Sequence, residues 1–533
     1  MTRIFTHPYR YVESMKKTPV TTSIRVAGLF ALVLGWPAIG SLVGCTDLSE
    51  VPASSITPEN FYQNEDQVIG GLASVYAQLR STTDEYYNIS EISTDEMIVP
   101  TRGNDWYDNG KWLDIHRQTW GPNSPAGLDN INSAWVNLFT GVARANVVLA
   151  AMDKVQLADK PVVTAELRTL RAFYYFLLMD MFGGVPIVTD IAIQARPQNT
   201  RAEVFAFIET ELKASRDALP ASWPANMNGR MTKGATDAIL ASMYLNAQVF
   251  TGTVSTTGLA KGPQRWQDAV DASNRILNSG TYSLASDWRS NFTWDNYNSP
   301  EIIMAVKFAA QSGLGLNFLM RALHYNQYTP APWNGFSTLA DTYFAFDAAD
   351  KRKQIFLAGP QFNVETGAPV KDRAGNPLIF DPTIADITSA KENEGVRITK
   401  WPSDPNHVNQ DNGNDYAHFR LGEIYLIKAE ALNELGNTAG AVDLVNTIRA
   451  RVFSPAKPLS AASFSQATFR DQILKERLFE LTAEGKRRQD LIRMGRYGDA
   501  WGFKAVSAPY RILLPIPQIQ VDTNPMLKQN PGY

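Results

Sequence analysis

Aromatic side chains flanked by carboxylates and amides are the residues of this chain whose types and spacing best suit ligand binding. Trp106 and Tyr107 are adjacent, with Asn104 and Asp105 before them and Asp108 after them. The local glycine, asparagine and aspartate content predicts a loop, so these rings are not expected to complete a buried helix seam. A sugar offers apolar C–H faces to aromatic rings and hydroxyl groups to polar edges. We therefore interpret this segment as a stacking platform for a ligand.

A second loop of the same character lies far along the chain. Residues 324–336 read HYNQYTPAPWNGF, in which Trp333 and Asn334 follow two prolines and Tyr325 lies near the start. Proline and glycine favour turns, so this segment is also predicted to be a surface loop that contacts the ligand. If both loops bind one ligand, Trp106 and Trp333 must converge in the fold although more than 200 residues separate them.

The chain offers little for metal chemistry. It has one cysteine and five histidines, and no histidines form an HExxH or HxH pair, so we expect no zinc site and no cofactor. Asp105 and Asn109-Gly110 match three positions of a calcium loop, but Tyr107 and His116 stand where oxygen ligands are required. We therefore expect no metal in this loop.

Hydrolytic chemistry is also poorly supported. A glycoside hydrolase needs two carboxyl groups about 5–10 Å apart, one of them with a raised pKa. The adjacent Asp95 and Glu96 are candidates, but adjacent carboxylates are typical of a solvated turn. We therefore predict a binding protein rather than an enzyme. Two alternatives stay open: a secreted helical glycoside hydrolase, and a helical scaffold that binds only proteins and gives the aromatic loops no role.

The composition bounds the class of protein. The chain has 533 residues, of which 44% are hydrophobic and 19% are charged, as expected for a globular protein of several structural units. Since 50 basic residues face 53 acidic ones, bulk positive charge cannot attract nucleic acid. We expect no nucleic-acid partner.

The N-terminal segment has the pattern of an export signal. Residues 26–44 carry no charge, follow a basic stretch and end in small residues, which is typical of a secretory signal peptide. The tetrapeptide LVGC, which ends at Cys45, resembles a bacterial lipobox. We predict that residues 1–44 are removed, that Cys45 is lipidated, and that residues 45–60 form a tether. Met15 is an alternative start.

The rest of the chain has the pattern of a mostly helical fold. Thr164–Phe182 repeats apolar residues at helical spacing before two glycines, and Arg420–Leu435 does the same before a Gly-Asn turn and a second helix. This pair of helices resembles a tetratricopeptide unit. Further helices are expected near residues 61–80, 131–153, 201–218, 234–250, 265–278 and 467–495.

One long region departs from this helical pattern. Residues 280–420 are rich in glycine, proline, asparagine and aromatic residues, with strand-like runs at Glu301–Phe308 and Val396–Lys400. Irregular segments of this length commonly carry binding.

Five segments together resemble the SusD/RagB family of nutrient-binding outer-membrane lipoproteins, and they occur in the family's order. They are LRTLRAFYYFLLMDMFGGVPIVTD (167–190), GRMTKGATDAILASMYLNAQVF (229–250), FRLGEIYLIKAEALNELG (419–436), ERLFELTAEGKRRQDLIRMG (476–495) and LLPIPQIQVDTNPMLKQNPGY (513–533). We expect the charged residues of the fourth segment to pair along one helix face.

The resemblance implies both a fold and a role. The fold is a scaffold of tetratricopeptide-like helix pairs, with an N-terminal region 61–279 and a C-terminal region 280–533. The latter comprises an irregular binding part (280–419) and closing helices (420–533). The role is to bind an oligosaccharide at the outer membrane, facing the exterior, and to pass it to a SusC-like TonB-dependent transporter. Some relatives are similar to peptide or other nutrient binders, and the family binds without catalysing.

Overall fold

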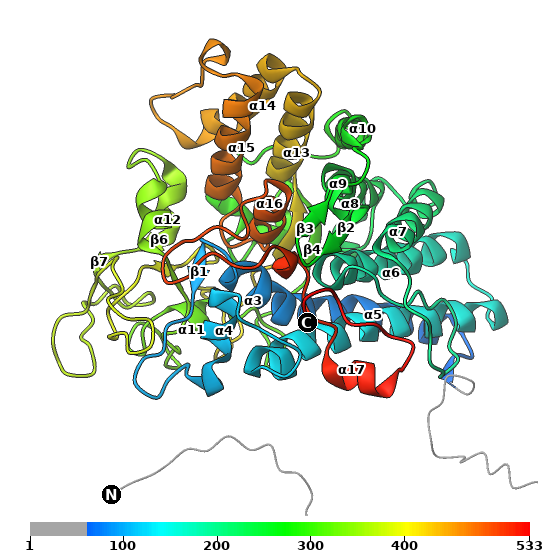
Figure 1. The fold of residues 1–533 in the computed structure, drawn as a ribbon, viewed down its shortest axis with the longest axis horizontal. Coiled ribbons are helices and arrows are strands. Elements are labelled where there is room, and N and C mark those ends of the chain that lie inside the picture. The colour runs from blue at the N-terminus through cyan, green and yellow to red at the C-terminus, as the bar shows by residue number, and fades with distance from the viewer. Residues whose placement is uncertain (1–60) are drawn as a thin grey trace, which may run out of the picture. The chain divides into compact units, whose positions relative to one another are not determined.

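The computed structural model describes residues 61–533, and long α-helices form its scaffold (Figure 1). These helices are α2 (Glu65–Gln78), α5 (Asn132–Ala151), α6 (Lys160–Phe182), α7 (Arg201–Arg216), α8 (Lys233–Leu245), α10 (Trp266–Leu277), α13 (Leu421–Glu434), α14 (Thr438–Val452) and α15 (Gln466–Leu481). Most pack against their sequence neighbours, as α5 does against α6, α6 against α7, α8 against α10 and α13 against α14. The predicted mostly helical fold is confirmed.

Shorter helices lie between and beyond the long ones. They are α3 (Glu85–Ile92), α4 (Lys111–Arg117), α9 (Ala247–Phe250), α11 (Phe318–Ala322), α12 (Ala340–Ala345), α16 (Arg487–Arg493) and α17 (Gln518–Thr523). The described residues form one compact unit, in which α10 packs against α13 across the predicted boundary at residue 280. The predicted signal peptide and lipidated Cys45 lie outside the described residues.

The strands are short and pair antiparallel. The pairs are β1 (Met97–Ile98) with β5 (Ser337–Thr338), β4 (Ile302–Val306) with β10 (Tyr416–Arg420), β2 (Thr253–Ser255) with β3 (Gly258–Ala260), β6 (Phe356–Leu357) with β9 (Arg397–Ile398) and β7 (Gly359–Pro360) with β8 (Ile379–Phe380). β4 and β9 fall within the two predicted strand-like runs. Outside the helices, the predicted irregular region is held by these pairs and by short turns.

Helix α6 is the best-buried element of the scaffold. From Ala165 to Phe182 every residue except Arg168 is buried, so this helix has no polar face of the kind a surface helix shows. It ends where predicted, because Gly183 adopts a φ of 74° that other residues rarely reach. α5 packs on it from one side. The apolar stretch Gly127–Lys154, which includes α5, is long enough to cross a membrane, but half of it is buried in the fold.

The helix predicted near residues 467–495 is broken into α15 and α16. Ala483 and Gly485 have φ angles of 63° and 72°, which no α-helix accommodates. Between them, Glu484 projects inward and accepts hydrogen bonds from Arg420 and Lys400. The break therefore places a buried carboxylate that a continuous helix could not place there.

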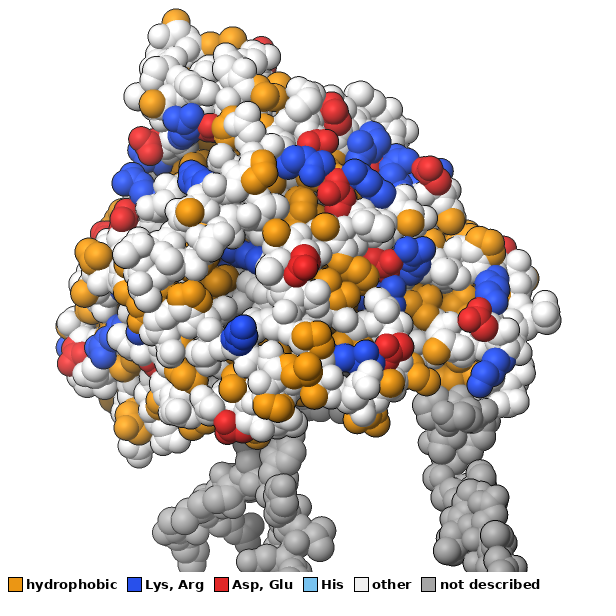
Figure 2. Space-filling view, turned by 45° about the vertical axis from the view of Figure 1, so that its right-hand side comes forward, with side chains coloured by type: hydrophobic (Ala, Val, Ile, Leu, Met, Phe, Trp, Pro, Cys, Tyr) orange, Lys and Arg blue, Asp and Glu red, His pale blue; other side chains and the backbone are white. Residues whose placement is uncertain are grey.

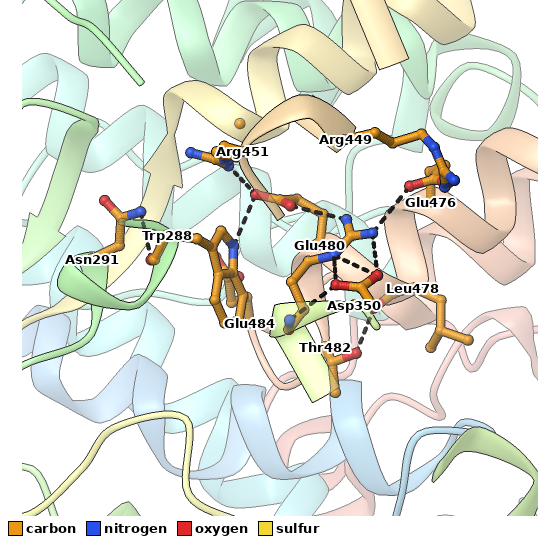
Figure 3. A network of polar contacts seen from close by, with 12 residues as sticks. Trp288, Asn291, Asp350, Arg449, Arg451, Glu476, Leu478, Glu480, Thr482 and Glu484 are labelled. Carbon is orange, nitrogen blue, oxygen red and sulfur yellow. Dashed lines mark hydrogen bonds and ion pairs between the residues drawn. The ribbon is translucent and has the colours of Figure 1, made fainter. Parts of the chain in front are cut away.

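A buried ion network joins the closing helices to the irregular region (Figure 3). Glu480 of α15 accepts hydrogen bonds from Arg420, Arg451 and Arg352, and from the Trp288 indole at 3.0 Å. Arg352 also pairs with Glu476, and Glu301 lies between Arg420 and Arg451. The prediction that these charges pair with one another along one helix face is therefore wrong. The partners come from different elements and are almost completely buried.

The network depends on complete pairing. Burial by itself would raise the pKa of Glu480, but Arg451, Arg420 and Arg352 outweigh burial and hold this pKa well below its usual range. Removing one partner of a buried ion pair leaves an uncompensated charge, which typically costs about 3–5 kcal/mol.

Charges of both signs are mixed on the molecular surface. Figure 2 shows one face, on which lysine and arginine side chains lie close to aspartate and glutamate, with hydrophobic groups between them. This mixture agrees with the nearly balanced count of charged residues in the sequence.

Candidate ligand-binding site

The two aromatic loops predicted from the sequence lie side by side. The Trp106 indole Nε1 donates a hydrogen bond to the backbone oxygen of Trp333 at 2.6 Å. The Tyr325 hydroxyl donates to the Asp105 carboxylate at 2.5 Å. We call the surface formed by Asn104, Asp105, Tyr107, Tyr325, Trp333, Arg373 and Glu392 the aromatic surface.

The first loop is a tight turn with strained backbone. Gly103 has a φ of 64°, and the backbone groups of Arg102 and Asp105 bond to each other across the turn. Trp106 follows with a φ of 62°, a conformation that is uncommon for a bulky residue. Such strain persists only where the surroundings hold the residue in place.

Packing around Trp106 supplies that restraint. Its ring lies edge-on to Trp112 and Phe336, with ring centroids 5.5 and 5.6 Å away. It also covers Gly335 so closely that a Cβ atom there would lie 2.3 Å from the indole. Trp106 is therefore half-buried, and its ring helps to fix the conformation of the loop, while its contact with a ligand stays a prediction.

Tyr107 is the open ring of the aromatic surface. It is 58% exposed, and it follows a turn in which Asn104 is exposed and Asp105 is half-buried. Tyr325 and Trp333 are half-buried, and Trp333 packs against the cluster that contains Leu323. The surface therefore combines one exposed ring, Tyr107, with two half-buried rings, Tyr325 and Trp333.

Arg373 contacts Tyr325, Asp105 and Glu392 on this surface and was not predicted from the sequence. It comes from the loop between β7 and β8, and its guanidinium group lies 4.2 Å from the centre of the Tyr325 ring. It forms ion pairs with Glu392 and, at 3.7 Å, with Asp105, while half of its side chain is exposed. No motif marks an arginine in such a loop, so only the fold could identify it.

The charges of these groups are well defined at neutral pH. Burial would raise the pKa of Glu392, but hydrogen bonds from His324 and Arg373 lower it, so this carboxylate is ionised. Burial lowers the pKa of His324, which therefore stays neutral. Burial and the bond to Asp105 raise the pKa of Tyr325 to about 12, so its hydroxyl keeps its proton. The surface thus presents two carboxylates, one guanidinium group and a phenol.

Two of the predicted ligand residues have other roles. Asn334 is fully buried, and its side-chain oxygen accepts hydrogen bonds from Arg397. Its side chain therefore cannot reach a surface ligand, and the prediction for it is corrected. Asp108 is exposed, but its carboxylate accepts a hydrogen bond from the Trp112 indole at 2.7 Å and so helps to hold that ring.

Two buried arginines hold the second loop from behind. Arg102 donates to the backbone oxygens of Asn334 and Glu394, and Arg397 donates to the Asn334 side chain and to the backbone of Glu392. Burial lowers the pKa of Arg102 to about 10, so it remains charged at neutral pH. Carbonyl oxygens rather than carboxylates solvate both guanidinium groups. They fix the backbone that carries Glu392 and Trp333.

The acidic pair considered for hydrolysis does not form an active-site geometry. Arg487 binds both oxygens of Asp95 at 2.6 and 2.7 Å. Glu96 is buried and accepts a hydrogen bond from the backbone of Ala483 at 3.0 Å. Glu96 is therefore not the solvated turn residue that was expected. Within residues 61–533, no three His, Cys, Asp or Glu side chains gather closely enough to hold a metal ion.

Comparison with known protein families shows to which family the chain belongs. The sequence model of the SusD family matches residues 237–533, which is more than half of the chain. The chain belongs to the SusD family. A further model, described as starch-binding and associating with the outer membrane, matches residues 48–245. The resemblance inferred from the five sequence segments is confirmed.

Individual relatives of this SusD-family protein are distant but match over most of their length. It is 25% identical over 543 residues to the SusD-like protein P25 of Formosa agariphila, covering 93% of this chain and 98% of that protein. It is 25% identical over 507 residues to the starch-binding protein SusD of Bacteroides thetaiotaomicron, covering 84% and 85%.

Solved structures share the fold of this SusD-family protein. A laminarin-binding SusD-like protein has a TM-score of 0.69 at 23% identity, and the match covers 89% of this chain and 100% of that chain. Surface glycan-binding protein A from Bacteroides thetaiotaomicron, in complex with laminarihexaose, has a TM-score of 0.69 at 19% identity, covering 88% and 99%. The predicted scaffold of tetratricopeptide-like helix pairs is thereby confirmed.

Proposed function

We propose that this SusD-family protein binds an oligosaccharide at the aromatic surface. The observation that carries the proposal is that the loop of exposed Tyr107 is hydrogen-bonded to the loop of Tyr325 and Trp333, with Arg373 over the Tyr325 ring. The names of its relatives support it, since they include a starch-binding protein and a laminarin-binding protein.

The chemistry of the surface suits a sugar ring. Tyr107 offers an apolar face for C–H groups, because more than half of it is exposed. Asp105 and Glu392 accept hydrogen bonds from hydroxyl groups, and Arg373 and Asn104 can donate them. Arg373 already covers one face of Tyr325, so a ligand would reach this ring at its edge or displace the guanidinium group.

The proposed role is binding without catalysis. Asp105 and Glu392 both pair with Arg373, and Glu392 has a lowered pKa. A glycosidase acid needs a raised pKa to protonate the leaving group. Glu392 is therefore not the carboxylic acid of raised pKa that hydrolysis requires.

We further propose that the protein acts at the outer membrane and passes its ligand to a SusC-like TonB-dependent transporter. Lipidation at Cys45 would attach the mature chain, with residues 45–60 as the tether and the binding surface facing the cell exterior. The description of the family model that matches residues 48–245, starch-binding and associating with the outer membrane, supports this location.

A calorimetric screen of the mature protein tests the proposed binding. Neutral oligosaccharides of several linkages, together with peptides of matched length, would be titrated into the wild-type protein. Binding of an oligosaccharide that is abolished or weakened by Tyr107→Ala supports the proposal. Binding of peptides and of no oligosaccharide would instead support the alternative that the protein is a peptide binder of the same family.

A further inference from the structure

A second groove lies among elements that do not contribute to the aromatic surface. A cavity of about 330 Å³ is lined by α2 and by segment 226–230, and a cavity of about 200 Å³ adjoins it towards Trp223 and Tyr282. The two cavities share Asn228, Gly229, Arg230 and Ala305 as lining residues, so they adjoin each other and together make up one region of the surface. We call it the α2–β4 groove.

The charged side chains that line this groove are all basic. Arg80, Arg230 and Lys307 line it, and neither cavity has an aspartate or glutamate among its lining residues. The carboxylates that pair with two of these cations lie beneath the groove. Glu166 binds Arg230 and Asp415 binds Lys307, and both carboxylate side chains are at most 2% exposed.

Arg80 is the cation without a carboxylate partner. Its Nε donates to the backbone oxygen of Lys307 at 2.9 Å, and among residues 61–533 it forms no ion pair. Three cations therefore line the groove above two buried carboxylates. Arg80 interacts with Asp415 at longer range, so three cations share two carboxylates, and the net positive charge of the groove attracts an anion.

The walls of the groove are aromatic and polar rather than uniformly apolar. The Arg230 guanidinium group lies 3.9 Å from the centre of the Trp223 ring. Tyr282 and Thr232 bond to each other at 3.1 Å on the opposite wall. The side chain of Asn228, which lines both cavities, donates to the backbone oxygen of Tyr297, a residue that is 48% exposed. Rings with hydroxyl and amide groups at their edges suit sugar units.

We propose that the α2–β4 groove is a second binding site, which takes an oligosaccharide that carries carboxylate or sulfate groups. Arg80 binds the anionic group, and the apolar floor at Ile69 and Ala73 contacts C–H faces. On the aromatic surface, by contrast, Asp105 and Glu392 are both paired with Arg373, and this surface is assigned to neutral sugars. The two surfaces thus differ in the charge of the sugar that they accept.

Calorimetry with acidic and neutral tetrasaccharides tests the proposal. The probes are oligogalacturonate and alginate tetrasaccharides for carboxylate, a chondroitin sulfate tetrasaccharide for sulfate, maltotetraose as the neutral probe, and a tetra-aspartate peptide. We expect at least one acidic tetrasaccharide to bind the wild-type protein, and to bind roughly tenfold more weakly to Arg80→Gln because a charge-assisted hydrogen bond is lost. Arg80→Lys should keep part of the affinity.

The controls separate this groove from the aromatic surface. Tyr107→Ala should leave acidic binding unchanged, and melting temperatures of all variants should stay near that of the wild type. The proposal is overturned if no acidic tetrasaccharide binds, or if Arg80→Gln binds as tightly as the wild type. It is equally overturned if the peptide binds as tightly as the sugars, since the groove would then recognise charge alone. Weaker binding of maltotetraose to Tyr107→Ala would test the aromatic surface and would not bear on the α2–β4 groove.

Discussion

The Trp106 indole nitrogen donates a 2.6 Å hydrogen bond to the backbone oxygen of Trp333, across 227 residues of sequence. This bond ties the 104–108 turn to the loop that carries Tyr325 and Trp333. Each loop also has contacts of its own: the Trp106 ring packs against Trp112, and buried Arg102 donates a hydrogen bond to the backbone oxygen of Asn334. The aromatic surface is therefore preorganised by a network that lies largely beneath it.

Trp106→Ala should destabilise the fold as well as the site. The substitution removes a half-buried ring from its contacts with Trp112 and Phe336, and large-to-small changes of this kind cost about 3 kcal/mol. Urea unfolding measures the loss. An unchanged free energy of unfolding would show that Trp106 is a free surface ring, as its sequence context alone suggested.

Glu480→Gln should lower the free energy of unfolding by about 3–5 kcal/mol, because Arg352, Arg420 and Arg451 keep their other carboxylate partners but the buried network is left with one positive charge in excess. The matched control is Glu434→Gln, which breaks the more exposed pair with Arg470. Exposed pairs contribute about 0–1 kcal/mol, so this control should unfold nearly as the wild type does. Equal losses in the two variants would contradict the assigned role of the network.

Glu91→Gln should change how stability depends on pH. Burial raises the pKa of Glu91 to about 7 and that of neighbouring Glu96 well above its usual range, while an unfolded glutamate titrates near pH ~4.3. Glu91 therefore stays protonated to a higher pH in the folded chain than in the unfolded chain. The free energy of unfolding consequently falls as the pH rises from about 4.5 through about 7.

The measurement for Glu91 is the melting temperature at pH 5 and at pH 8. Glutamine keeps an acceptor for the backbone N–H of Gly485 but cannot ionise. We expect the variant to gain stability at pH 8 and to change little at pH 5. If the melting temperature of the variant falls between pH 5 and pH 8 as much as that of the wild type, ionisation of Glu91 is not the cause of the fall.

Cys45→Ala should release the protein from the membrane or leave an uncleaved precursor. One acyl chain gives only marginal attachment, so the mature cysteine is expected to carry several chains. Membrane fractionation and mass determination of the N-terminus measure the outcome. Normal processing and membrane retention of the variant would rule out the lipobox interpretation.

The helices were predictable because apolar residues recur along the chain at helical spacing. Thr164–Phe182 and Arg420–Leu435 both coincide closely with observed helices. The break at residues 482–486 was not predictable, since Ala483 is an ordinary helix former that is held at positive φ by its surroundings. Tertiary contacts of Glu96 and Glu484 favour the break over local propensity.

The site was predictable in its loops but not in its assembly. Asn334 stands in a proline and glycine context that suggests exposure, but two buried arginines bind its side chain and backbone. Arg373 carries no local signal, because its importance arises from lying over Tyr325, which is 48 positions earlier in the sequence. Side-chain roles of this kind depend on long-range packing that a single sequence does not encode in a readable pattern.

The most direct test of the proposed function is the oligosaccharide affinity of Tyr107→Ala, compared with that of Phe344→Ala. Both rings are similarly exposed, at 58% and 63%, but Phe344 lies on α12 and outside the aromatic surface. Loss of a stacked ring is worth about 1–3 kcal/mol by analogy with stacking on bases, which is roughly a 5- to 150-fold weaker affinity. We predict that loss for Tyr107→Ala alone, with melting temperatures unchanged in both variants. Equal affinity of the two variants and the wild type would contradict oligosaccharide binding at the aromatic surface.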